Sequence, residues 1–107
     1  MRPLKTDELQ LITFLLRKAP SYLHLLNNLE GSLVEEMQDG GMGSLKFLSG
    51  NKFRIMKLEI SRIDTLKDAD SVPLSITLNL GTDDELYELD IFKRDFSSLI
   101  KFPQHPY

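Results

Sequence analysis

The 107-residue sequence contains no cysteine and no tryptophan, and only six glycines and five prolines. Without cysteine the protein forms no disulfide and has no thiol for catalysis or zinc binding. Its glycine and proline content is too low for a collagen-like or low-complexity chain. The hydrophobic fraction of 41% is enough for one globular core. We therefore predict a single domain over residues 1–107.

Long apolar runs are also absent. Uninterrupted hydrophobic stretches are short, as in Phe14-Leu15-Leu16, whereas a membrane-spanning helix needs about 20 residues. Asp7 and Glu8 lie where a signal peptide would have its apolar region. We expect a cytoplasmic protein without a membrane partner.

Basic charge is not in excess. The formal net charge is −3, from 13 basic and 16 acidic residues, so the chain lacks the positive field by which proteins hold nucleic-acid phosphates. Lys52, Arg54 and Arg62 are interspersed with acidic residues, a pattern typical of a solvated sheet. We expect no nucleic-acid partner.

Motifs of enzymes and metal sites are missing. The two histidines, His24 and His105, lie in no nucleophile or metal-ligand pattern, and no GxSxG or kinase motif occurs. The sequence therefore assigns no catalytic, metal-binding or cofactor-binding residue. It favours a non-enzymatic protein, without excluding a site assembled in three dimensions.

Two amphipathic helices are predicted near the N-terminus. Ile12 and Leu16 belong to an apolar stripe at helical spacing, and Pro20 ends the pattern, which predicts a helix at about residues 6–18. The same spacing of apolar residues predicts a second helix at about residues 21–30.

Beyond these helices the periodicity changes to the alternation of strands, with turn-forming residues between them. Five strands are predicted, at about residues 33–38, 44–48, 53–63, 72–80 and 86–92. To keep the apolar residues of the last two strands on one face, we expect an odd pairing sum, for instance Leu78 opposite Tyr87. The sequence thus predicts an α+β fold, with the two helices packed on one face of an antiparallel, roughly five-stranded meander sheet.

Polar side chains gather on the other face of the last two predicted strands. Thr77, Asn79, Glu88 and Asp90 alternate with apolar residues, so we expect them to share one surface. The surrounding segment, residues 83–95, holds six acidic residues against two basic ones. Three interpretations remain open, namely a solvated sheet face, a docking surface for a basic partner, and a catalytic or metal site.

A glycine-rich segment at residues 39–45 is a second candidate. Gly40, Gly41 and Gly43 permit positive φ angles, which favours a hairpin or bulged turn. The spacing of a phosphate-binding loop is absent, and a strand rather than a helix follows. Gly41 and Met42 are candidate partner contacts, with gap-filling in the core as the alternative for Met42.

Two segments resemble a known family. Asp39-Gly40-Gly41-Met42-Gly43-Ser44-Leu45 and the run from Leu86 to Pro103, with the pattern L-x-E-L-D-I-x-K-x-D-F-x-x-L-I-x-F-P, are similar to segments of small uncharacterised bacterial single-domain proteins, a domain of unknown function. The strand that begins at Val72 lies between them, so the similarity spans most of the chain. The resemblance implies a bacterial protein and supplies no activity, cofactor or catalytic residue.

Two hypotheses of different class follow. The first is a non-enzymatic protein-interaction module that uses the acidic sheet face, with an immunity-like role against a basic toxin as one form of it. The alternative is a small-molecule-binding or catalytic domain with a pocket between the helices and the sheet. Homodimerisation through a sheet edge or an exposed apolar strip is a further hypothesis.

Overall fold

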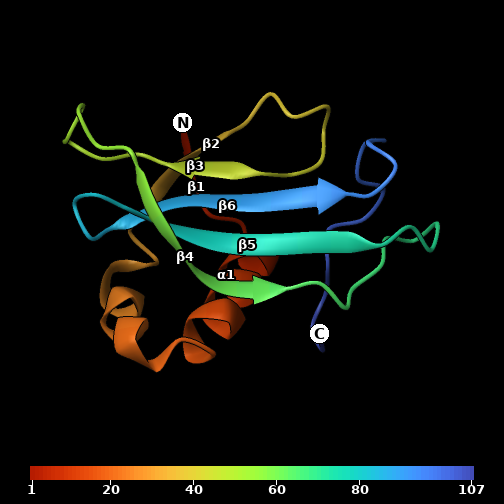
Figure 1. Ribbon diagram of the computed structural model, residues 1–107, viewed down its shortest axis with the longest axis horizontal. Coiled ribbons are helices and arrows are strands. Elements are labelled where there is room, and N and C mark those ends of the chain that lie inside the picture. The colour runs from red at the N-terminus through yellow and green to blue at the C-terminus, as the bar shows by residue number, and fades with distance from the viewer.

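Two helical segments and six strands make up the protein, whose computed structural model describes residues 1–107 (Figure 1). In chain order they are β1 (Arg2–Pro3), α1 (Thr6–Arg17), the 3-10 helix η1 (Pro20–Asn28), β2 (Leu33–Glu36), β3 (Leu45–Phe47), β4 (Met56–Ile63), β5 (Leu74–Gly81) and β6 (Leu86–Lys93). The predicted α+β fold with an antiparallel sheet is confirmed. The predicted number of strands is wrong, because β1 is two residues long and leaves no alternation to detect.

All six strands form one antiparallel sheet in the order β1-β2-β3-β6-β5-β4. The predicted meander is therefore also wrong, since β3 pairs with β6 and β4 lies at the far edge beside β5. In the β3–β6 pair, Leu45 lies opposite Leu89, and both side chains are buried in the core. Burial of these two leucines joins two hairpin regions that are distant in the sequence.

The first predicted helix is found as an α-helix, whereas the second differs from prediction in type. α1 buries Leu11, Ile12, Leu15 and Leu16 along one side, as the apolar spacing indicates. The second segment is a 3-10 helix over Pro20–Asn28 and not the regular helix predicted over residues 21–30. Leu25 is its only buried residue. A 3-10 helix, which has three residues per turn, is enough to bring that one side chain to the core. Neither segment has the length and apolar character of a membrane-crossing helix.

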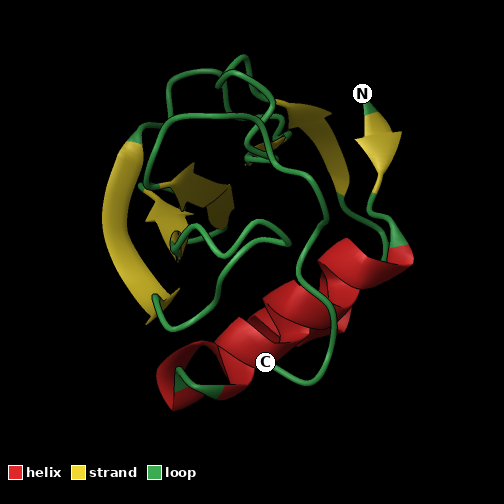
Figure 2. Cartoon of the chain, turned by 90° about the vertical axis from the view of Figure 1, so that its right-hand side faces the viewer, coloured by secondary structure: helices red, strands yellow, loops and turns green.

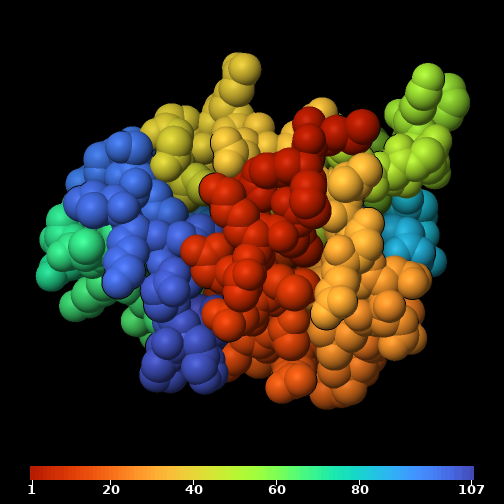
Figure 3. Space-filling view, turned by 180° about the vertical axis from the view of Figure 1, so that it is seen from behind, coloured from red at the N-terminus to blue at the C-terminus, as the bar shows by residue number.

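One hydrophobic cluster of 17 buried side chains forms the core, with members from both helical segments and from β2 to β6. Figure 2 shows the strands curving around one side of the molecule and the helices along the other. Seen from behind, the N-terminal residues, red to orange, cover the middle of the surface, and the C-terminal segment lies beside them (Figure 3).

The pairing of β5 with β6 decides which side chains reach the core. Leu78 lies opposite Leu89 and not opposite Tyr87, so the predicted register is wrong by two residues. The pairing sum stays odd, and the faces remain as predicted. A bulge follows, because Leu80 pairs with Leu86 and leaves Tyr87 as the extra residue. Leu86 therefore takes the core position predicted for Tyr87.

A buried ion pair holds the segment that follows β6. The Lys93 ammonium lies 2.8 Å from Asp68 and 2.7 Å from Asp70, and the side chains of Lys93 and Asp68 are fully buried. Asp68 also accepts the N–H groups of Ile100, at 2.8 Å, and Lys101, at 3.1 Å. Burial by itself raises the pKa of Asp68, but these hydrogen bonds outweigh it and hold that pKa well below its usual range.

Candidate functional site

The four polar residues predicted to share a face form two cross-strand pairs at the centre of the sheet. Thr77 lies opposite Asp90, and Asn79 lies opposite Glu88. Direct partners in an antiparallel pair project from the same face. The Asn79 amide also donates a hydrogen bond of 2.6 Å to the Asp90 carboxylate across the two strands. The structure therefore brings all four residues together.

The neighbouring strands extend this surface in both directions. Lys46 of β3 lies opposite Glu88, while Glu59 and Arg62 of β4 lie opposite Asn79 and Thr77. We use the name polar face for the following set: Glu35, Lys46, Glu59, Arg62, Ser75, Thr77, Asn79, Glu88, Asp90 and Phe92. Sequence reasoning missed Lys46 as a neighbour of Glu88, because alternation gives the face of a residue and not the strand beside it.

Electrostatics single out Glu88 and Asp90 on the polar face. Burial raises the pKa of Glu88, and Asp90 raises it further, against a lowering by Lys46. Burial also raises the pKa of Asp90, against a lowering by the hydrogen bond from Asn79. Neither carboxylate takes part in an ion pair. Two partly desolvated negative charges thus lie side by side without a basic partner in contact.

The remaining charges of the polar face compensate for this pair only in part, because Lys46 lowers the pKa of Glu88. Arg62 is occupied, because its guanidinium lies 2.9 Å from Glu59 and donates a 3.0 Å hydrogen bond to Ser75. Lys46 is exposed and makes no ion pair. Acidic side chains outnumber basic ones four to two, namely Glu35, Glu59, Glu88 and Asp90 against Lys46 and Arg62. The polar face therefore carries a negative formal net charge.

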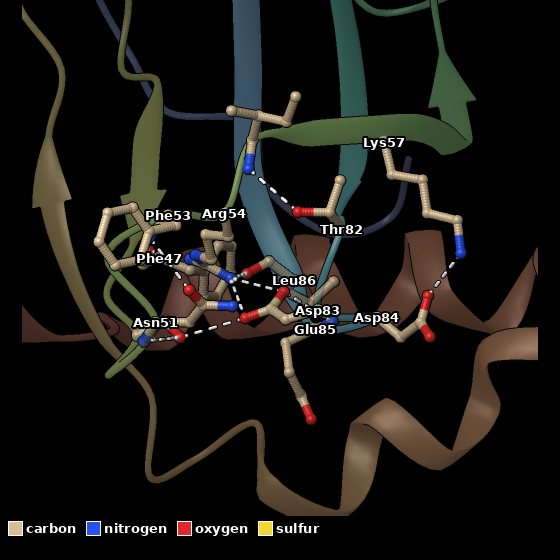
Figure 4. Close-up of polar contacts among 12 residues, drawn as sticks. Phe47, Asn51, Phe53, Arg54, Lys57, Thr82, Asp83, Asp84, Glu85 and Leu86 are labelled. Atoms are coloured by element: carbon tan, nitrogen blue, oxygen red, sulfur yellow. Dashed lines mark hydrogen bonds and ion pairs between the residues drawn. The ribbon is translucent and has the colours of Figure 1, made fainter.

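Most of the other acids in residues 83–95 have partners elsewhere. Asp83 accepts hydrogen bonds from Arg54, at 3.3 Å, and from Ser49, at 3.1 Å. Asp84 forms a 2.7 Å ion pair with Lys57 (Figure 4). Asp95 accepts the hydroxyl and the backbone N–H of Ser97. The acidic stretch of the sequence is thus not one surface, and Glu88 and Asp90 are its members on the polar face.

Arg54 is the centre of the contacts in Figure 4. Its guanidinium donates to the carbonyl oxygens of Phe47 and Leu86 as well as to Asp83, and its side chain is only 5% exposed. The expectation that Arg54 is a solvated sheet residue is therefore wrong. Its position just before β4 lets it join the ends of β3 and β6, a non-local contact that sequence alternation does not reveal. With these acceptors engaged, Arg54 is not free to hold an anionic ligand.

Gly41 and Met42 lie against the C-terminal part of the chain. The Gly41 carbonyl accepts the N–H of Leu99 at 2.9 Å, and a Cβ at Gly41 would lie 3.1 Å from the Ser98 Cβ. The Met42 sulfur lies 3.2 Å from the backbone nitrogen of Lys93. Apart from the bond that the Met42 N–H donates to Asp39, the contacts of Gly41 and Met42 therefore go to the C-terminal segment and the end of β6, and not to Thr77, Asn79, Glu88 or Asp90.

A hollow of about 230 Å³ lies between η1 and one end of the sheet. Leu25 and Asn28 of η1 line it, together with Phe47, Arg54 and Leu86. No group of three or more carboxylate or histidine side chains in the protein is placed to hold a metal ion. Nine residues line the hollow, and four of them are hydrophobic.

Comparison with known proteins gives one match. A family model described as a domain of unknown function (DUF6984) matches residues 1–103. No curated protein and no solved structure matches the chain. The matched range contains every strand and both helical segments, so the polar face lies within the family's domain.

Proposed function

The chain belongs to the DUF6984 family, a domain of unknown function, and from that premise we propose that it is a non-enzymatic interaction module that binds a basic partner protein through its polar face. One observation carries the proposal, namely that Glu88 and Asp90 are partly desolvated and lack an ion-pair partner. The proposal takes α1 and η1 to cover the opposite face of the sheet, which leaves the polar face free.

The physical reason is that the bound protein would have charge-assisted hydrogen bonds that the free protein lacks. Charge-assisted hydrogen bonds are stronger than neutral ones, and a Lys or Arg from a partner would supply the missing donors. Asn79 holds Asp90 in one orientation through the 2.6 Å hydrogen bond, so little side-chain entropy remains to be lost on binding. Strands also position side chains more rigidly than loops do.

The location proposed for this protein is the bacterial cytoplasm, and the partner proposed is a basic protein. In a bacterial cytoplasm, a small acidic domain of this kind would act in an immunity-like role by covering a basic toxin. Complementary charge would speed their encounter and exclude wrong partners. Binding would then weaken as the salt concentration rises.

The test uses a synthetic heptapeptide, Arg-Ser-Ser-Ser-Arg-Ser-Ser, titrated by calorimetry into the full chain at low salt. We expect binding that weakens at least tenfold in the double variant Glu88→Gln/Asp90→Asn, because two acceptors of charge-assisted hydrogen bonds are lost. The matched control Asp84→Asn/Glu85→Gln removes two carboxylates from the β5–β6 turn and should bind as the wild type does. Equal affinity in the two double variants would contradict the proposal.

A second candidate function rests on the hollow between η1 and the sheet. Because Arg54 is engaged by protein acceptors, the ligand there would be a neutral molecule with apolar surface. Titration with indole, followed by the amide signals of Leu25 and Asn28, tests it. Saturable shifts at these residues, removed by the filling substitution Leu25→Phe, would favour a small-molecule-binding protein.

A further inference from the structure

An exposed aromatic pair lies at one end of the polar face. Phe92 lies opposite Ser75, in the row of side chains next to Thr77 and Asp90. Its ring meets the ring of Phe96 edge to face, with the centroids 5.1 Å apart and the planes at 83°. Phe92 is 42% exposed and Phe96 is 70% exposed. The exposed parts of these two rings do not contribute to the core.

The backbone of Phe96 is also unusual. Its φ angle is +64°, in the left-handed region that suits glycine and asparagine and is an outlier for a bulky side chain. The Phe96 N–H closes the turn after β6 by donating to the Lys93 carbonyl at 2.9 Å. A glycine would fit this turn without strain, so the turn itself does not call for a phenylalanine.

We propose that Phe92 and Phe96 form one docking surface with Glu88 and Asp90, and that this surface binds an extended segment of the partner with a basic side chain two residues from an apolar one. The inference rests on the proposed function and names the partner's chemistry. The basic side chain would lie on the carboxylates, and the apolar one would lie against the aromatic rings.

Spacing and charge support this choice of occupant. Asp90 and Phe92 are two residues apart on β6, which puts their side chains about 7 Å apart along one face. An extended partner segment presents its own residues i and i+2 at the same spacing. Arg62, which lies opposite Thr77, is already bonded to Glu59 and Ser75. A cation from outside therefore finds its free acceptors at Glu88 and Asp90.

Aromatic side chains suit the role of an anchor. Interface residues that dominate binding are enriched in large side chains that become fully buried, and here two rings already pack on each other in the free protein. The aliphatic stem of an arginine or lysine can also pack along a ring while its charge reaches Asp90. The surface thus offers both contacts within one row spacing of the sheet.

The experiment compares two heptapeptides by calorimetry on the full chain. Arg-Ser-Leu-Ser-Arg-Ser-Leu has leucine two residues after each arginine, and Arg-Ser-Ser-Ser-Arg-Ser-Ser has serine there. We expect the leucine peptide to bind the wild type at least fivefold more tightly, and Phe96→Gly to remove this difference. Phe53→Ser, which changes an aromatic residue 94% exposed in the loop before β4, is the control and should keep the difference.

Thermal unfolding of the same variants separates docking from a structural role. Because glycine accepts the φ of +64°, Phe96→Gly should unfold at the same temperature as the wild type or higher. A lower unfolding temperature, or an unchanged preference for the leucine peptide, would overturn the inference. If Glu88→Gln/Asp90→Asn still weakens both peptides in that case, the proposed function stands without it. Failure of both peptides to bind the wild type would contradict both.

Discussion

Two aspartates, Asp68 buried and Asp90 partly buried, illustrate at the residue scale how surroundings set the effect of a carboxylate on stability. Asp68 accepts the backbone N–H groups of Ile100 and Lys101 and lies 2.8 Å from the Lys93 ammonium, and its pKa is low. Asp90 has one side-chain donor, Asn79, and its pKa is raised. The charge of Asp68 therefore stabilises the fold, whereas the charge of Asp90 opposes it.

The first prediction concerns Asp68. Asp68→Asn should lower the free energy of unfolding at pH 7 by about 3 kcal/mol, because it breaks a buried ion pair and its hydrogen bonds. Urea unfolding measures the change. The control Asp70→Asn, at a side chain 34% exposed, should have a much smaller effect. Equal losses in the two variants would contradict the account.

The same residue predicts a dependence on pH. The folded-state pKa of Asp68 lies below the unfolded value, which is about 3.9. Its stabilisation is therefore present above that unfolded pKa and is lost as the pH falls toward the folded one. Urea midpoints measured from pH 7 to pH 3 should fall more steeply in the wild type than in Asp68→Asn. Parallel curves would be evidence against this role.

Glu88 should behave in the opposite way. Its folded-state pKa is raised, so its contribution to stability is present below the unfolded pKa of about 4.3 and is lost as the pH rises through the folded value. We expect Glu88→Gln to raise stability at pH 7 by about 0.5 kcal/mol and to give no gain near pH 3. A variant less stable than the wild type at pH 7 would show that this charge supports the fold.

At the scale of elements, local patterns predicted what each strand buries and not what lies beside it. Alternation in β5 correctly predicted that Leu78 is buried and that Thr77 is on the other face. The bulge at Tyr87 could not be predicted, because it depends on how the β5–β6 turn closes. The pairing of Lys46 with Glu88 is a contact between distant segments, and a local pattern carries no information about such contacts.

A substitution of Arg54 tests the contacts between elements, because Arg54 joins the ends of β3 and β6 to the residues before β4. Arg54→Lys keeps the charge but cannot reach the Phe47 and Leu86 carbonyls and Asp83 together. We expect a loss of about 2 kcal/mol in urea unfolding and faster amide exchange at Phe53 and Ile55. Unchanged exchange there would mean that another contact holds this loop.

For the whole molecule, the sequence predicted the class of fold and the four central residues of the polar face, but not the extent of that face. Its full width, from Glu35 to Arg62, exists only because β3 joins β6. The same topology leaves β4 at the edge. There, two bulges and a 2.6 Å hydrogen bond from Lys18 to the Arg62 carbonyl work against pairing with a second copy.

The most direct test is a map of amide chemical shifts on the full chain as the peptide Arg-Ser-Leu-Ser-Arg-Ser-Leu is added. The account predicts the largest shifts at the central rows of the polar face, at Thr77, Glu88, Asp90 and Phe92, with their loss in Glu88→Gln/Asp90→Asn. Shifts confined to Leu25 and the hollow beside η1, or spread evenly over the acidic residues of the surface, would contradict it.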